Sequence, residues 1–366
     1  MKVRDDVLEH QDDLGTSGTK IYNLDYADLI SGIDLDFGAT NGAASNKNSP
    51  IERCVSKIEI VDGGVVLWDL PGDVAYALYS QEHGAPADDY YTECPSDTPY
   101  VSIPIRFGRE LYDPQLSFNP RSFKNPQLKI TFNEAAVNTA GATGFVSDSI
   151  HLSIIARLME DAPAPEGFLS CRDVKEFTSL ASGDDITEMP TDYPWRLLIV
   201  RAYEAGTDLR GTWSNLKLSC DGGKFVPFDM SSGNVVSRMA EIFPMTSRGN
   251  YCRADDGDTI QTWMGVDLAQ MIHARTASRV AVAGAFWPGQ TTVHTYDLDG
   301  TAQNDVDVHL NVNGYAPHNT VLVPFGRINV LEEYFNAPQY GTVKLYLTQG
   351  DADAEVNIAV QQLRRY

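Results

Sequence analysis

Residues 58–64 read IEIVDGG and residues 216–223 read LKLSCDGG, and these two stretches decide the fold. In each, apolar residues alternate with polar ones and lead into Asp-Gly-Gly. Period-2 alternation predicts a strand with one buried face, and glycine supplies the positive φ that a tight hairpin needs. The aspartates of the two turns, Asp62 and Asp221, lie 159 residues apart (221 minus 62), which is the size of one β-domain.

Further matches follow the two turns in the same order, which predicts an internal duplication. The matched pairs are residues 72–74 with 233–235, 104–109 with 324–327, 118–120 with 335–338, 128–130 with 343–345, and two last strands at 151–158 and 356–363. Turn chemistry repeats in any β-protein, but agreement of both order and residue type favours two copies of one unit.

The repeat divides the chain into four parts. We expect an N-terminal arm at 1–29, a first unit at 30–160, a linker at 161–194 and a second unit at 195–366. The second copy is longer between its turn and its Pro-Phe-Gly-Arg, so we expect an insertion at about 231–300 that projects from one end. Within it, Asp258 and Gln261 are spaced like a capping box, and the apolar residues that follow predict a helix from Asp258 to Ala274.

The net charge of −22 and the pI near 4.6 argue against nucleic-acid binding over a broad surface. Basic residues at the ends (Lys2, Arg4, Arg364, Arg365) are interpreted as solubilising charges, with contact to the inner surface of an assembly as the alternative. Five widely spaced cysteines without a CxxC argue against a disulfide framework or zinc site. This cysteine usage favours synthesis in a reducing cytoplasm, and residues 1–13 are too polar for a signal peptide.

The sequence contains no Gly-x-Ser-x-Gly elbow, phosphate-binding Gly-Lys-Ser/Thr loop, dinucleotide glycine fingerprint or His-Glu-x-x-His. We therefore predict no catalytic residue, no cofactor and no metal ligand. His309 and His318 lack the spacing of a metal pair and are interpreted as turn or surface residues. Paired aspartates are interpreted as solvated loops, with calcium binding as the alternative. These pairs are Asp297 with Asp299, Asp305 with Asp307, and Asp351 with Asp353.

A second hypothesis stays open, a two-domain β-sandwich that binds or hydrolyses carbohydrate. An exposed groove lined by Trp68, Trp195, Trp213 or Trp287 beside paired carboxylates would favour it.

Several of these motifs resemble those of the double jelly-roll major capsid proteins of tectiviruses, corticoviruses and related lipid-containing phages, with adenovirus hexon as a distant relative. The residues that carry the resemblance are 39–42, 45–50, 58–63, 118–120, 125–128 and 360–364. The resemblance covers most of the chain from about Ile30. It implies an all-β protein of two tandem eight-stranded jelly-roll barrels, with the insertion as a tower loop in the second.

The resemblance also implies a function, a structural role in a virion and not an enzymatic one. It implies a homotrimer that forms a pseudo-hexagonal capsomer of an icosahedral shell, often over an internal membrane. The expected partners are therefore two further copies, neighbouring capsomers, minor capsid or penton proteins and a lipid membrane. The arm before Ile30 is expected to lie low, toward the membrane or a neighbouring capsomer.

Overall fold

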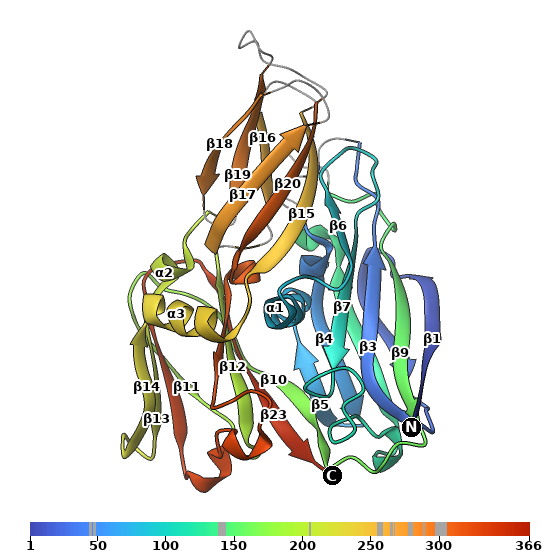
Figure 1. Ribbon diagram of the computed structural model, residues 1–366, viewed down its shortest axis with the longest axis vertical. Coiled ribbons are helices and arrows are strands. Elements are labelled where there is room, and N and C mark those ends of the chain that lie inside the picture. The colour runs from blue at the N-terminus through green and yellow to red at the C-terminus, as the bar shows by residue number, and fades with distance from the viewer. Residues whose placement is uncertain are drawn as a thin grey trace.

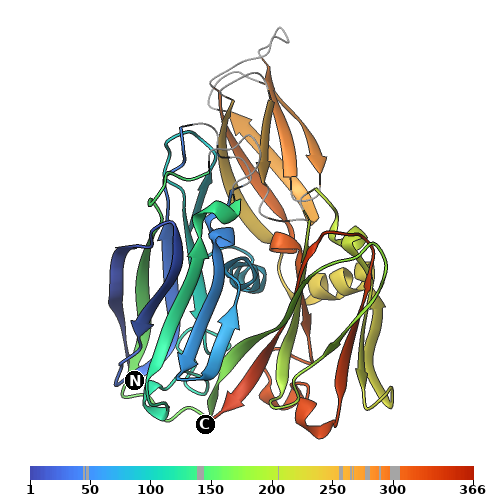
Figure 2. The same ribbon diagram turned by 180° about the vertical axis from the view of Figure 1, so that it is seen from behind.

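The computed structural model describes the chain apart from residues 44–45, 47–48, 138–143, 205, 255–258, 264–265, 267, 277–280, 288–289 and 297–305. Two β-units stand side by side, and a third group of strands projects beyond one end of them (Figure 1). Both chain termini lie at the opposite end, as the reverse view also shows (Figure 2).

The first unit packs two sheets face to face. One has the order β1 (Lys2–Asp13), β9 (His151–Glu160), β3 (Leu29–Gly38), β7 (Tyr100–Arg106) and then the short β6 (Asp89–Thr92). The other has the order β2 (Ser17–Asn23), β8 (Pro126–Asn133), β4 (Val55–Asp62) and β5 (Val65–Leu70). Helix α1 (Gly72–His83) follows β5.

The second unit repeats this topology for every strand except β6. One of its sheets has the order β10 (Gly167–Thr178), β23 (Glu355–Arg365), β12 (Trp195–Tyr203) and β21 (Thr320–Pro324). The other has the order β11 (Gly183–Glu188), β22 (Val343–Gln349), β13 (Trp213–Cys220) and β14 (Phe225–Ser231). Helix α3 (Ser232–Ile242) follows β14 as α1 follows β5, and the short α2 (Leu209–Thr212) precedes β13.

Irregularities of the strands repeat as well. The β3–β9 pairing shifts register between Ile30 and Gly32, and the β12–β23 pairing shifts between Trp195 and Leu197. The outer strands β1 and β10 likewise share a shift, between Val7 and Glu9 in β1 and between Asp173 and Lys175 in β10. Because a bulge is a specific local feature, these coincidences confirm the duplication predicted from the sequence. The all-β double jelly-roll fold is confirmed, although each unit is a sandwich of open sheets and not a closed barrel.

Alternating burial shows how the sequence pattern builds the core. In β8 and β22 every second side chain is buried between the sheets, and the intervening ones are partly exposed. One connected apolar cluster runs through both units and contains the fully buried Trp195 and Trp213. In the described part of the chain, no helix is long and apolar enough to cross a membrane.

The insertion of the second unit is built of strands. Strands β15 (Thr246–Ala254), β20 (Val306–Tyr315) and β17 (Leu268–Thr276) continue the first unit's sheet through a parallel β6–β15 pairing. Strands β16 (Thr259–Trp263), β19 (Gln290–Tyr296) and β18 (Ala281–Trp287) form a second small sheet. The helix predicted for 258–274 is therefore wrong, because β16 and β17 pair with distant strands and tertiary pairing overrides local periodicity.

Three predicted boundaries also need correction. The expected arm at 1–29 contains β1 and β2, which pair with β9 and β8 of the first unit. The expected linker at 161–194 contains β10 and β11, which pair with β23 and β22. The insertion expected at 231–300 begins after α3, the counterpart of α1, and extends through β20. The strands β1, β2, β10 and β11 were not predicted because they lie at sheet edges. Edge strands are exposed on one side, and their sequences are therefore polar and often acidic.

Candidate assembly site: two equivalent bases and the seam between the units

Each unit has an end that we call its base, where the turn between β4 and β5 or between β13 and β14 lies. In both bases the aspartate of Asp-Gly-Gly accepts two backbone hydrogen bonds. The amide nitrogens of residues 124 and 125 lie 3.2 and 2.8 Å from the Asp62 carboxylate. Those of residues 341 and 342 lie 2.9 and 3.0 Å from Asp221. The repeated aspartate therefore ties the hairpin to the loop that enters β8 or β22.

Removing either carboxylate is expected to destabilise the protein modestly. We predict that Asp62→Ala and Asp221→Ala each lower the free energy of unfolding by about 1 kcal/mol, because two amides lose a charged acceptor at a partly hydrated site. Urea unfolding followed by fluorescence measures the change. Asp25→Ala, in the exposed loop between β2 and β3, is the control. A loss no larger than that of the control would show that the repeated aspartates have no structural role.

A second contact that both units share is an ion pair between an arginine and a carboxylate. Arg109 donates from Nε and Nη2 to Asp113 at 2.7 and 3.0 Å, and Arg327 donates from Nε to Glu333 at 2.8 Å. The hydrogen bond from Arg327 holds the pKa of Glu333 below its ordinary value. A Cβ on the glycine before each arginine would lie 2.6 or 2.7 Å from the Cβ of the paired acid, so only glycine fits there. This explains why Gly-Arg recurs in both copies.

Stacked aromatic rings fill each base. In the first unit the successive centroids are 5.0 and 5.1 Å apart, and in the second they are 4.9 and 5.5 Å apart. Such pairs contribute beyond their buried area. The rings are Phe107, Phe118 and Phe123 in the first base and Phe325, Phe335 and Tyr340 in the second.

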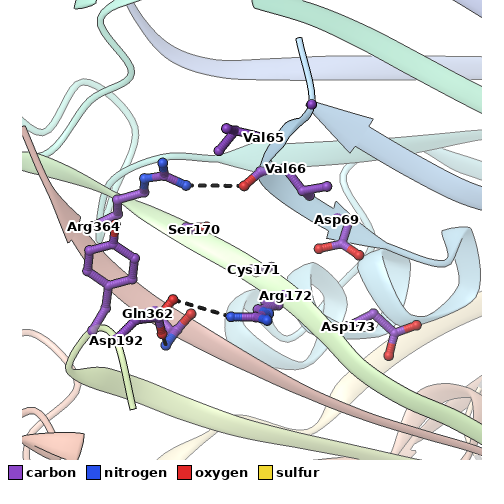
Figure 3. Close-up of a pocket in the computed structure, with 12 residues that line it drawn as sticks. Val65, Val66, Asp69, Ser170, Cys171, Arg172, Asp173, Asp192, Gln362 and Arg364 are labelled. Atoms are coloured by element: carbon purple, nitrogen blue, oxygen red, sulfur yellow. Dashed lines mark hydrogen bonds and ion pairs between the residues drawn. The ribbon is translucent and has the colours of Figure 1, made fainter. Parts of the chain in front are cut away.

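The two units meet where β5 of the first packs beside β10 and β23 of the second, and we call this contact the seam. Ser170 donates its hydroxyl to the carbonyl oxygen of Leu67 at 2.5 Å, and Arg364 donates to that of Val66 at 3.1 Å. Side chains of the second unit thus cover the outward carbonyls of an edge strand, which would otherwise be open to pairing. Figure 3 shows the Arg364 contact beside Val65 and Val66.

A cavity of about 520 Å³ opens along the seam and is lined by both units. Asp69 of β5 and Asp173 of β10 lie at one side of it (Figure 3). Burial raises the pKa of Asp69 to about 6. Burial, and after it the negative charges of Asp69 and Glu176, raise the pKa of Asp173 to about 7. The seam therefore holds two carboxyl groups whose ionisation opposes the native packing.

A second junction lies beside helix α1, where the insertion meets the first unit through a buried ion pair. Arg248 of β15 holds Asp89 of β6 in a bidentate pair, with Nε and Nη2 at 2.6 and 2.9 Å from the two carboxylate oxygens. Its Nη1 lies 3.4 Å from Glu52 Oε1, and His318 Nε2 lies 3.0 Å from the same oxygen. All four side chains are almost inaccessible to solvent. Burial raises the pKa of Glu52 and keeps that of His318 well below its ordinary value.

A second buried arginine links α1 to the second unit. Arg201 of β12 lies 2.7 Å from Asp73 at the start of α1 and 2.9 Å from Glu355 of β23. We call the set Glu52, Asp73, Asp89, Arg201, Arg248 and His318 the buried charge cluster. Its members come from both units and the insertion, so the cluster fixes how the three pieces sit relative to one another.

The residues singled out from the sequence are dispersed. Trp68, Trp195 and Trp213 are buried, so they line no exposed groove, and the side chain of Trp287 lies outside the described residues. These three tryptophans therefore do not form the exposed groove that would favour the carbohydrate hypothesis. Asp351 and Asp353 lie in the loop between β22 and β23, whereas Asp297, Asp299 and Asp305 lie outside the described residues.

The histidines divide between the two expected environments. His309 is exposed and its ring lies 4.8 Å from that of Tyr251, which confirms a surface position. His318 lies in a turn as predicted, but it is fully buried beside Glu52, because the η4 turn (Pro317–Asn319) packs against α1. The sequence offered no signal for this burial.

Three of the four basic residues of the chain ends lie at the bases and contact acids there, whereas Arg364 contacts the carbonyl oxygen of Val66 at the seam. Arg4 contacts Glu160 at 2.7 Å, and Lys2 contacts Asp161 at 3.4 Å. Arg365 lies 3.6 Å from Glu166.

Comparison with solved structures identifies the class of fold. The chain superposes on the STIV MCP with a TM-score of 0.60 at 8% identity, covering 99% of this chain and 97% of that one. It matches the capsid protein of PBCV-1 with a TM-score of 0.57 at 10% identity, covering 99% and 93%. It matches the major capsid protein P2 from bacteriophage PM2 with a TM-score of 0.54 at 10% identity, covering 99% and 98%.

At such low identity the similarity establishes the fold alone, and it confirms the predicted likeness to double jelly-roll capsid proteins at that level. No protein-family model matches the chain, and no curated protein sequence matches it.

Proposed function

We propose that this chain is the major capsid protein of an icosahedral virus, in which three copies form a pseudo-hexagonal capsomer. The observation that carries the proposal is the presence of two equivalent sandwiches with matched bases, fixed side by side by the seam and the buried charge cluster. Three such chains present six similar units, which is the geometry that tiles a shell. The end-to-end likeness in fold to three viral capsid proteins supports the same role.

The proposal assigns the chain a structural role without catalysis. The partners are two further copies, neighbouring capsomers and the minor or penton proteins that close the shell at its vertices. The insertion lies at the end of the molecule opposite the bases and both termini (Figure 1). We therefore place the insertion on the outside of the shell and the bases toward an internal membrane.

The oligomeric state tests the capsomer. The purified full chain has a mass of 40.3 kDa, and light scattering should give about three times that value at micromolar concentration. Electron microscopy of virus particles should then locate the trimer in the shell. A chain that stays monomeric at all concentrations, and binds no other copy in particles, would contradict the capsomer.

The internal membrane has a test of its own. Lipid extraction from purified particles, followed by mass spectrometry, should recover phospholipid in an amount that covers the inner surface of the shell. Intact particles without lipid would contradict the membrane and leave the capsomer unaffected.

A further inference from the structure

The seam inside one chain is a head-to-tail contact. It joins the β5 flank of the first unit to the β10 flank of the second, and these are different surfaces of equivalent units. In such a heterologous contact each unit uses only one of its two surfaces. The equivalent of the β5 flank on the second unit, and the equivalent of the β10 flank on the first unit, therefore have no partner within the chain. The unused surfaces are β14, the counterpart of β5, and β1, the counterpart of β10. They lie on opposite outer flanks of the molecule (Figure 1).

The pairing registers place individual residues in correspondence. Ile60 pairs with Trp68 in the first unit, and Leu218 pairs with Phe228 in the second. Trp68 of β5 therefore corresponds to Phe228 of β14. By the same offset of 160 residues, Asp69 corresponds to Asp229, and Val66 at the seam corresponds to Val226.

The partner strands correspond through their shared bulge. Asp173 is the last residue before the shift in β10, and Val7 is the last before the shift in β1. Val7 therefore occupies in the first unit the position that Asp173 occupies at the seam.

Both unused edges expose apolar side chains. Val3 and Val7 of β1 are 52% and 60% exposed, and Phe225 and Val226 of β14 are 46% and 37% exposed. Large apolar side chains gathered on a sheet edge favour burial against a partner. Pro227 has no backbone N–H, so β14 is a poor template for a continued ladder. The seam also is a contact of side chains with backbone carbonyls, without a strand ladder between β5 and β10.

We propose that β14 of one copy packs against β1 of the next copy, reproducing the seam between chains. In this contact Phe225 and Val226 lie against Val3 and Val7, and Asp229 lies beside Val7 as Asp69 lies beside Asp173. The proposal rests on the trimeric capsomer and specifies its interface. Three seams within chains and three such contacts between chains close a ring of six units.

Crosslinking tests the contact directly. The variant Val7→Cys/Asp229→Cys, treated with a short bis-maleimide, should give covalent dimers and trimers on a denaturing gel. The matched control is Ile21→Cys/Ile186→Cys, two equally exposed positions on β2 and β11, at 54% and 52%. The control should stay monomeric on the same gel. Each single-cysteine variant is run alongside to account for the chain's own thiols.

Charge placed on the same edges supplies a second measurement. Val7→Glu/Phe225→Glu should shift the trimer seen by light scattering to monomer, while circular dichroism shows an unchanged fold because both sites are exposed. Ile21→Glu/Ile186→Glu should leave the trimer intact. A stable trimer that neither crosslinks through Val7 and Asp229 nor dissociates with the glutamates would overturn this interface and leave the capsomer standing. Absence of any trimer in the wild-type chain would contradict the capsomer itself.

Discussion

Arg248→Met is expected to lower the free energy of unfolding by about 3–5 kcal/mol, the largest single effect that we predict. The substitution keeps much of the side-chain volume but removes the charge that faces Asp89 and Glu52. Both carboxylates are nearly inaccessible to water, so each would have to bind a proton or remain charged in a low-dielectric site. Chemical unfolding at pH 7 of the full-length chain measures the loss.

Two further variants separate charge from shape. Arg248→Lys retains the charge but loses the bidentate geometry, so it should retain part of the stability. In the triple variant Arg248→Met/Glu52→Gln/Asp89→Asn the uncompensated charges are gone, and much of the loss should be recovered. If Arg248→Met costs no more than an exposed substitution, the buried charge cluster does not hold the insertion to the first unit.

The fold could be predicted from the sequence wherever a short local motif recurs in both units. The Asp-Gly-Gly turns, the ion pairs of the arginine in Gly-Arg and the last strands all lie at equivalent places in the two units. Each depends on neighbours in the chain or on glycine's conformational freedom, so it leaves a trace in the sequence.

Features that depend on distant partners were missed. Glu52 and Arg248 are 196 residues apart, and Glu52 and His318 are 266 apart, so no local pattern could pair them. The helix predicted at 258–274 failed for the same reason: its apolar spacing fits a helix, but pairing with β19 and β20 makes it two strands. The segment 1–29 looked like an arm because β1 and β2 are edge strands whose sequences are mostly polar.

The second large effect is expected at the seam, where Asp173→Asn should raise the free energy of unfolding by about 2 kcal/mol at pH 8. Burial and the nearby negative charges raise the pKa of Asp173 to about 7 in the folded chain, against an ordinary value of 3.8. An acid with a raised pKa is more protonated in the folded state, so its contribution to stability is present below pH 4 and is lost as the pH rises to 7. The figure of about 2 kcal/mol is well below the full conversion of the shift, because Asp173 is partly hydrated.

Asparagine keeps the shape of the side chain without its charge, so the variant should lose much of the decline in stability between pH 4 and 7. Urea unfolding at pH 4, 5, 6, 7 and 8 compares it with the wild type and with Asp25→Asn, an exposed control. The two curves should meet near pH 4 and diverge above it. Parallel curves across the whole range would mean that Asp173 is fully hydrated, and that its ionisation does not oppose the contact between the units.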